Sequence, residues 1–300
     1  MARRHLTTDP TTAYDHREGT PAGAPASPGL REGTPAGAPA SPPDSLVALA
    51  ARGQLPPHQY PDRPTLDWMA AHRPRPGPSS HPVPRPATRA LIRRSATPPH
   101  WTAEPRLADS LHGIRHAMRT AAIAGVLAEA NGLDAADTAI AVVAAAVHDC
   151  RRRHDRDDPG HGERAAHWLT ARAGEVWAHF GLPAPAPHAV VRAATAVRLH
   201  DVPYEDFAPG SGDSGRSPYN STPYEEHRAV CDLVKAADAL DRYRLPKASW
   251  WPDTRRVRQP AFDTFRALAF DLVIGSERAR LAGADSADAV LSVLAEKDIA

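Results

Sequence analysis

The chain has 300 residues, of which 42% are apolar, and this content is enough for a packed core and excludes a wholly disordered protein. A formal net charge of +1 gives no general basis for binding nucleic acid or an anionic membrane, because both need a basic surface. The two cysteines, Cys150 and Cys231, form no CxxC pair, and no apolar run matches a signal peptide or a membrane span, so we expect a cytoplasmic protein without disulfides or a thiolate zinc site.

The first hundred residues differ in composition from the rest of the chain, because they hold 20 of its 32 prolines. A segment that begins at Arg17 recurs without change from Arg31, which makes a direct repeat with a fourteen-residue period. Proline at every third or fourth position removes backbone donors and blocks helix formation. The apolar stretch from Ser45 to Ala51 is the one helix candidate here. We therefore predict a low-complexity, mostly disordered tail over residues 1–100 and a globular domain over residues 101–300.

After Thr102, alanine, leucine and valine recur at spacings of three and four residues, and proline is confined to junctions. This pattern predicts an all-α fold, with Asp134 and Ser286 as helix N-caps. The stretch from Asp201 to Pro223, rich in Gly, Ser, Asp and Pro, is predicted to be a loop that forms a lid or an entrance wall. The predicted helices run from Ala103 to Asn131, Ala135 to Asp149, His161 to Phe180, Ala189 to Leu199, Tyr224 to Arg244, Ala261 to Leu281 and Ser286 to Lys297.

A polar pair, His148-Asp149, ends the alanine-rich helix that starts at Ala135. The near-continuous apolar character of that helix indicates burial, and polar groups at the end of a buried helix need a partner. A neutral imidazole and a carboxylate are suitable ligands for zinc, manganese or iron. The same dipeptide also occurs at His154-Asp155 and His200-Asp201, so only its context gives it meaning.

Two other predicted helices supply that context, since one carries His116 and the other carries Asp238 among small apolar residues. With these residues in this order, the chain resembles the HD-domain superfamily of metal-dependent phosphohydrolases over about residues 105–245. The runs Leu-His-Gly-Ile-Arg-His, His-Gly-Glu-Arg-Ala-Ala and Ala-Asp-Ala-Leu-Asp-Arg-Tyr-Arg resemble a poorly characterised branch of it. The resemblance implies an HD-type helical bundle in which His116, His148, Asp149 and Asp238 hold one divalent metal ion, such as Mn, Fe, Co, Zn or Mg.

His161 and His200 match the extended pattern of two-metal members of the superfamily, which implies a second metal bridged to the first by Asp149. The alternative is that these histidines donate hydrogen bonds to a substrate. His112 lies one turn before His116, so the pair can also be read as two metal ligands, although we favour His116 as the ligand and His112 as its support. After the HD pair, Cys150-Arg151 replaces the Gly-Lys of many relatives.

Basic residues near these motifs are candidates for binding a substrate phosphate, with a surface ion pair as the alternative for each. They are Arg119, Arg151, Arg152, Lys235 and Arg242. Asp241 is expected to orient an arginine or a ligand histidine. The acidic run from Asp155 to Asp158 is predicted to be a solvated turn. Core or lid packing is the favoured interpretation of Trp101 and Trp250-Trp251, with base stacking as the alternative.

The resemblance implies a hydrolase that cleaves a phosphate ester or anhydride, in a nucleotide or a related small phosphorylated metabolite, by means of a metal-activated water. His148, Asp149, Arg119 and Lys235 are its predicted catalytic residues. Two alternatives remain open, a mixed-valent di-iron oxygenase on the same fold and a non-catalytic nucleotide-sensing module. The two C-terminal helices carry no chemical assignment and are expected to complete the bundle.

Overall fold

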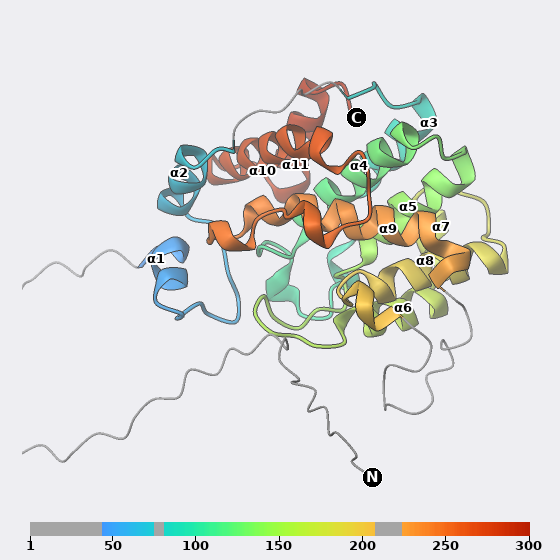
Figure 1. Cartoon of the computed structure of the whole chain (residues 1–300), viewed down its shortest axis with the longest axis horizontal. Coiled ribbons are helices and arrows are strands. Elements are labelled where there is room, and N and C mark those ends of the chain that lie inside the picture. The colour runs from blue at the N-terminus through green and yellow to red at the C-terminus, as the bar shows by residue number, and fades with distance from the viewer. Residues whose placement is uncertain (1–43, 75–80, 208–223) are drawn as a thin grey trace, which may run out of the picture. The chain divides into compact units, whose positions relative to one another are not determined.

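The computed structural model describes residues 44–74, 81–207 and 224–300, and all of its regular elements in these ranges are helical (Figure 1). The predicted all-α fold is confirmed for this part of the chain. The two copies of the repeat and most of the predicted lid loop lie outside the described residues. The α-helices are α1 (Leu46–Ala51), α2 (Arg63–Ala71), α3 (Pro86–Arg93), α4 (Ile114–Ala130), α5 (Ala135–Val147), α6 (His161–Ala171), α7 (Ala173–His179), α8 (Pro187–Leu199), α9 (Tyr224–Asp241), α10 (Arg266–Leu281) and α11 (Ser286–Glu296).

Helices α4 and α5 form the centre of the bundle. They pack against each other, and α9 packs on both of them. Nearly every side chain from Arg115 to Ala128 and from Thr138 to Val147 is buried. Many of these residues are alanines, whose small side chains let the helix axes approach closely. The predicted cap at Asp134 is confirmed, since its side chain accepts a hydrogen bond from the Asp137 amide.

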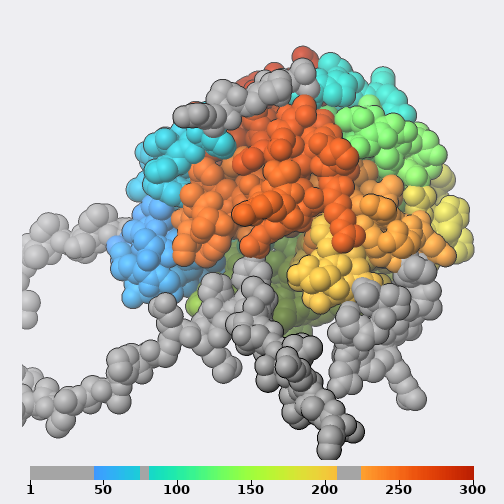
Figure 2. Space-filling model, in the orientation of Figure 1, coloured from blue at the N-terminus to red at the C-terminus, as the bar shows by residue number. Residues whose placement is uncertain are grey.

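The other helices surround this centre. Helix α8 packs on α5 and α9, and α6 packs on α8. Helices α10 and α11 pack on each other and on α4, as expected of elements that complete the bundle. Figure 2 shows residues 224–265, in orange, over the middle of the visible face, with the blue and cyan segments before residue 100 beside and above them.

The second half of the predicted disordered tail is folded in the structure. Helix α2 contacts α10, and α3 contacts α4 and α5. Leu66 and Met69 of α2 and Leu91 and Ile92 of α3 belong to the hydrophobic core. The described part of the compact unit begins at residue 44 rather than near residue 101. The prolines of α2 and α3 stand in the first turn of each helix, where no amide donor is needed, so they start these helices instead of blocking them.

Several predicted helix bounds also need correction. The stretch before Ile114 forms two short 3-10 turns instead of the start of a long helix. At Gly113 the chain folds back on itself, since a Cβ there would lie 2.2 Å from the carbonyl oxygens of Leu107 and Ala108. The predicted helix over residues 161–180 breaks at Arg172 into α6 and α7. The predicted helix over residues 224–244 ends in a 3-10 turn, and the one over residues 261–281 begins with a 3-10 turn. Asp285, not Ser286, caps α11.

Candidate metal centre

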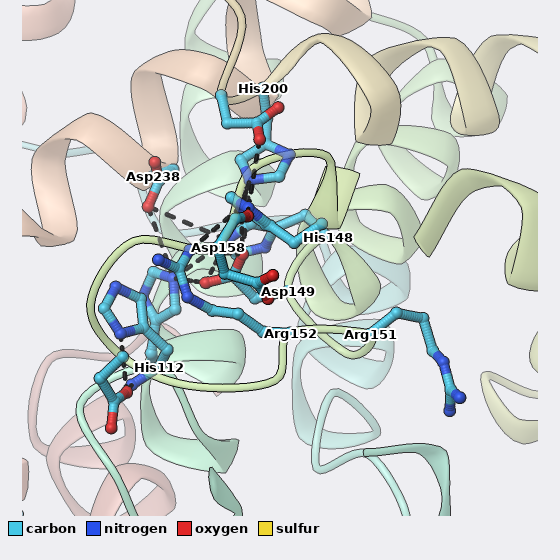
Figure 3. Close-up of polar contacts among 12 residues, drawn as sticks. His112, His148, Asp149, Arg151, Arg152, Asp158, His200 and Asp238 are labelled. Carbon is cyan, nitrogen blue, oxygen red and sulfur yellow. Dashed lines mark hydrogen bonds and ion pairs between the residues drawn. The ribbon is translucent and has the colours of Figure 1, made fainter. Parts of the chain in front are cut away.

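Six side chains from five helices converge at one buried place in the bundle. Four of them, His148, Asp149, His200 and Asp238, are labelled in Figure 3. His116 comes from α4, the pair His148-Asp149 from the end of α5, His161 from the start of α6, His200 from the end of α8 and Asp238 from α9. The four histidines and Asp149 are buried, and only Asp238 has a partly exposed side chain, at 20%. The structure therefore brings together all six residues predicted as metal ligands.

The first group consists of His116, His148, Asp238 and one oxygen of Asp149. The Nε2 atoms of His116 and His148 lie 3.0 Å apart. Oδ1 of Asp238 lies 3.4 Å and Oδ2 of Asp149 lies 3.5 Å from His116 Nε2. Both oxygens lie 3.8 Å from His148 Nε2. Ligand atoms about 3.0–3.8 Å apart can share one divalent ion at bond lengths of about 2.0–2.2 Å.

The second group consists of His161, His200 and the other oxygen of Asp149. The two Nε2 atoms lie 3.1 Å apart. Oδ1 of Asp149 lies 3.1 Å from His161 Nε2 and 3.4 Å from His200 Nε2. Asp149 therefore faces the first group with Oδ2 and the second group with Oδ1, which is the arrangement of a bridging carboxylate.

Hydrogen bonds at the opposite ring nitrogen fix the tautomers of three of these histidines. His148 Nδ1 donates to the Ala145 carbonyl, His161 Nδ1 to the Asp158 carbonyl and His200 Nδ1 to the Val197 carbonyl, at 2.6–2.8 Å. A carbonyl oxygen only accepts, so each Nδ1 carries a proton, and Nε2 is the atom through which each ring, when neutral, directs a lone pair into the centre. Oδ1 of Asp149 is also buried without a hydrogen-bond partner. Facing lone pairs and an unpaired carboxylate oxygen repel one another unless a cation lies between them, so this donor set fits a divalent metal ion.

The electrostatics of the metal-free centre agree with that fit. Burial lowers the pKa of His148 to about 3, which keeps the ring neutral and able to ligate. Burial opposes ionisation of Asp149, yet Arg152, His148 and His161 hold its pKa well below the usual value. Arg244 and the histidines likewise lower the pKa of Asp238 against the effect of burial. His200 departs from this pattern, because burial opposes its protonation but Asp201 and Asp149 outweigh the effect of burial and raise its pKa to about 9. Without a metal ion this ring is protonated at neutral pH, so a bound ion would displace the proton on Nε2.

A buried polar network holds His116 from behind. Its Nδ1 donates to Oδ2 of Asp241 at 2.8 Å, and Arg119 donates to both oxygens of Asp241 at 2.6 and 3.0 Å. Arg119 also donates to Glu277 at 2.8 Å, and Glu277 accepts from Arg115 at 3.0 Å. Asp241 thus orients both a ligand histidine and an arginine. Sequence reasoning missed Glu277 of α10, because no motif marks this residue.

Helices α6 and α8 approach each other closely at Gly162. A Cβ there would lie 2.7 Å from Oδ1 of Asp201 and 3.0 Å from the carbonyl oxygens of Val197 and Arg198. The missing side chain lets the first turn of α6 rest on the last turn of α8, which brings His161 to His200. The glycine in His-Gly-Glu-Arg-Ala-Ala therefore has a steric role in building the second group.

Most of the predicted phosphate ligands are engaged elsewhere. Arg119 is buried in the network behind His116. This position does not allow the direct contact with a substrate phosphate that the sequence predicts. Arg151 points away from the cluster in Figure 3 and donates to the Trp101 carbonyl. Arg242 donates to the Trp250 carbonyl. Lys235 donates to the carbonyls of His200 and Val202, so its contact with the centre is through the backbone at the end of α8.

Two arginines do reach the centre. Arg152 Nη1 lies 3.0 Å from His161 Nε2 and 3.5 Å from Oδ1 of Asp149. Arg244, which was not among the predicted residues, is buried and donates its Nε to the Leu111 carbonyl. Its Nη2 lies 3.8 Å from Asp238, and its Nη1 is buried without a hydrogen-bond partner. Arg244 ends the run Asp-Ala-Leu-Asp-Arg-Tyr-Arg, two residues after the predicted Arg242, and this position is its signal in the sequence.

His112 and the acidic run lie beside the centre. Asp155 accepts from His112 Nδ1 at 2.8 Å, from the Ser110 hydroxyl and from the Gln59 amide. His112 is not part of a ligand group within the described residues, which agrees with a supporting role. Asp155 and Asp158 are buried, so the solvated turn predicted for this run is wrong for these two residues. Asp158 instead binds Arg164 and fixes the start of α6.

Trp101 is buried, whereas Trp250 and Trp251 are partly buried. Trp101 is buried against Trp168, and Trp251 packs on Tyr243 and Trp68. These contacts favour the packing interpretation over a base-stacking platform.

Comparisons with known proteins identify no family for this chain. No family model, curated protein or solved structure matches this chain. Within the described ranges, none of the helices combines the length and the apolar character that crossing a membrane requires.

Proposed function

We propose that this chain is a metal-dependent phosphohydrolase of the HD-domain type. The observation that carries the proposal is the convergence of four Nε2 lone pairs on the two oxygens of Asp149, with Asp238 completing the first group. Burying this set of imidazoles and carboxylates in one place is costly without a cation between them. The order His116, His148-Asp149, Asp238 is also the one on which the family resemblance rests.

His116, His148, Asp149 and Asp238 would hold a divalent ion, with His161 and His200 beside it. Such an ion, when bound, lowers the pKa of a water ligand and polarises a phosphoryl oxygen. Asp149 and Asp238 neutralise its charge, and the hydrogen bonds at Nδ1 keep the imidazoles aimed at it.

Arg244 and Arg152 supply positive charge and hydrogen-bond donors for a phosphate group. Arg244 has its Nη2 3.8 Å from Asp238 and a buried Nη1 that makes no hydrogen bond and lies 3.7 Å from Asp241. Arg152 directs Nη1 at the opposite side of the centre. Guanidinium donors on two sides suit an anion whose charge is spread over several oxygens. We therefore propose a small phosphorylated metabolite, such as a nucleotide, as the substrate class.

The test is phosphate release from a panel of nucleotides and phosphomonoesters with added Mn²⁺, Co²⁺, Fe²⁺ or Zn²⁺. Asp149→Ala removes both bridging oxygens, and we expect it to lower the rate by at least about a hundredfold. Asp157→Ala removes an exposed carboxylate from the same loop and serves as the matched control. A substrate that is cleaved only with metal, and not by Asp149→Ala, is the expected result. Equal rates for wild type and Asp149→Ala would contradict the proposal.

The bridging position of Asp149 also favours a second candidate, a mixed-valent di-iron oxygenase. Protein purified without oxygen distinguishes the two, because a hydrolase needs no redox-active metal, whereas the oxygenase needs two irons per chain and has a visible spectrum. A non-catalytic nucleotide-sensing module would bind a nucleotide in the same assay and release no phosphate.

A further inference from the structure

The guanidinium of Arg152 is anchored on the side of the centre that faces α6. Its Nε donates to the His154 carbonyl at 3.1 Å, and its Nη2 donates to the Arg156 carbonyl at 3.0 Å. These two bonds within the loop direct Nη1 at His161 Nε2, 3.0 Å away. The side chain is only 11% exposed. Arg152 is therefore held in one orientation rather than free to leave the site (Figure 3).

The atom that Arg152 contacts is the atom that a second cation needs. His161 Nδ1 donates to the Asp158 carbonyl, so Nε2 has a single lone pair, and Arg152 Nη1 donates to it. A metal ion would take the same lone pair at about 2.1 Å. Because Arg152 Nη1 already donates to this lone pair from 3.0 Å, the guanidinium and a second ion compete for the same atom. Nη1 also lies 3.5 Å from Oδ1 of Asp149, the other ligand atom of the second group.

Among the residues that the structure describes, no arginine or lysine donates to an imidazole of the first group. His116 Nε2 and His148 Nε2 face each other at 3.0 Å. The guanidinium of Arg244 approaches this group only through Asp238 Oδ1, at 3.8 Å, which is too long for a hydrogen bond. The two groups share Asp149, yet they differ in their access to a cation.

We propose that Arg152 takes the place of the second divalent ion, so that the centre binds one metal ion per chain, at His116, His148, Asp149 and Asp238. The fixed guanidinium supplies the positive charge that a second ion would bring to Oδ1 of Asp149 and to a phosphoryl oxygen. This inference rests on the proposed metal centre, and it opposes the di-iron alternative, which requires both sites.

The test measures metal content after incubation with excess Mn²⁺ and removal of unbound ions, together with a calorimetric titration of the metal-free protein. We expect one Mn²⁺ per chain in the wild type and two in Arg152→Ala, because loss of the guanidinium frees the lone pair of His161. Arg152→Met, which keeps the length of the apolar stem, guards against a collapse of the loop in the alanine variant. The second ion should bind at least about tenfold more tightly in either variant than in the wild type.

Two further variants sharpen the result. Arg153→Ala removes the next and exposed arginine and should keep one ion per chain. The double variant Arg152→Ala, His161→Ala should return from two ions to one, which would locate the second ion at His161. Two ions in the wild type, or one ion in Arg152→Ala and Arg152→Met alike, would overturn the inference and leave the first site intact. Absence of bound metal from every variant would overturn the metal centre itself.

Discussion

Asp241 accepts a hydrogen bond from Nδ1 of His116 at 2.8 Å, and this contact fixes the ring whose Nε2 faces His148, Asp149 and Asp238. Asp241→Asn replaces the carboxylate by an amide and removes the partner charge of Arg119. Because carboxylates behind ligand histidines raise their basicity, we expect metal affinity to fall about 10–100-fold. Competition with a chelator measures the change, with the exposed Asp157→Asn as control. An unchanged dissociation constant would show that Asp241 does not position His116.

The same carboxylate predicts a dependence of stability on pH. Burial raises the pKa of Asp241, but Arg119 and His116 outweigh it and lower the pKa to about 2. A carboxyl with a lowered native pKa stabilises the fold above its unfolded value of about 3.9, and this stabilisation is lost as the pH falls toward 2. The free energy of unfolding of metal-free wild type should therefore approach that of Asp241→Asn between about pH 4 and pH 2. Urea unfolding in the presence of a chelator measures both, and a constant difference would contradict this assignment.

Glu277 joins α10 to the centre, since one of its oxygens accepts from Arg119 and the other from Arg115. All three side chains are buried. Glu277→Gln leaves two buried guanidinium groups without this counter-charge, and we expect a loss of about 3 kcal/mol in the free energy of unfolding. Glu296→Gln alters an exposed glutamate of α11 and should stay within about 0.5 kcal/mol of the wild type. Equal denaturation midpoints for the two variants would refute the structural role of Glu277.

Gly162 offers a steric test of how α6 meets α8. Gly162→Ala adds a Cβ about 3 Å from two backbone carbonyl oxygens, so the helices must separate, at a cost of about 1–3 kcal/mol. Gly174→Ala also adds a methyl group to a helical glycine, but nothing lies within 4 Å of it, and we expect a gain of about 0.5–1 kcal/mol. Thermal unfolding compares the two. Opposite signs are expected, and a gain for both would mean that the close approach at Gly162 carries no constraint.

The ligand residues were predictable because they are anomalies in their own helices. His148-Asp149 interrupts a buried alanine-rich run, and Asp238 lies among small apolar residues, so the local sequence already demanded a partner for them. Glu277 carries no such signal. Its role depends on contacts with Arg115 and Arg119, which lie 162 and 158 residues away in the sequence, and only the packing of α10 on α4 brings them together.

The start of the folded unit was misjudged for a different reason. High proline content predicts disorder, yet the effect of a proline depends on its position within an element. Pro64 and Pro86 stand in the first turns of α2 and α3, where the fixed φ favours the helix. The apolar residues that follow were too few to give a clear helical period, so their burial became visible only in the structure.

The burial of α2 and α3 against the bundle predicts how the protein responds to truncation. A chain that starts at residue 101 lacks Leu66, Met69, Leu91 and Ile92, each worth about 1.5–3 kcal/mol when buried. The sum, roughly 6–12 kcal/mol, is comparable to the whole stability of a typical domain. It also lacks Gln59, whose amide donates to Asp155 at 2.7 Å and whose carbonyl accepts from the Leu111 amide at 2.9 Å.

We therefore expect the chain that starts at residue 101 to lose cooperative unfolding, measured by circular dichroism during heating. A chain that starts at residue 44 retains every contact described above and should unfold cooperatively, near the temperature of the full chain. The second truncation is the control, because it removes proline-rich sequence without removing α2 or α3. If the chain from residue 101 unfolds as cooperatively as the chain from residue 44, then α2 and α3 rest on the bundle without stabilising it, and the boundary near residue 101 is restored.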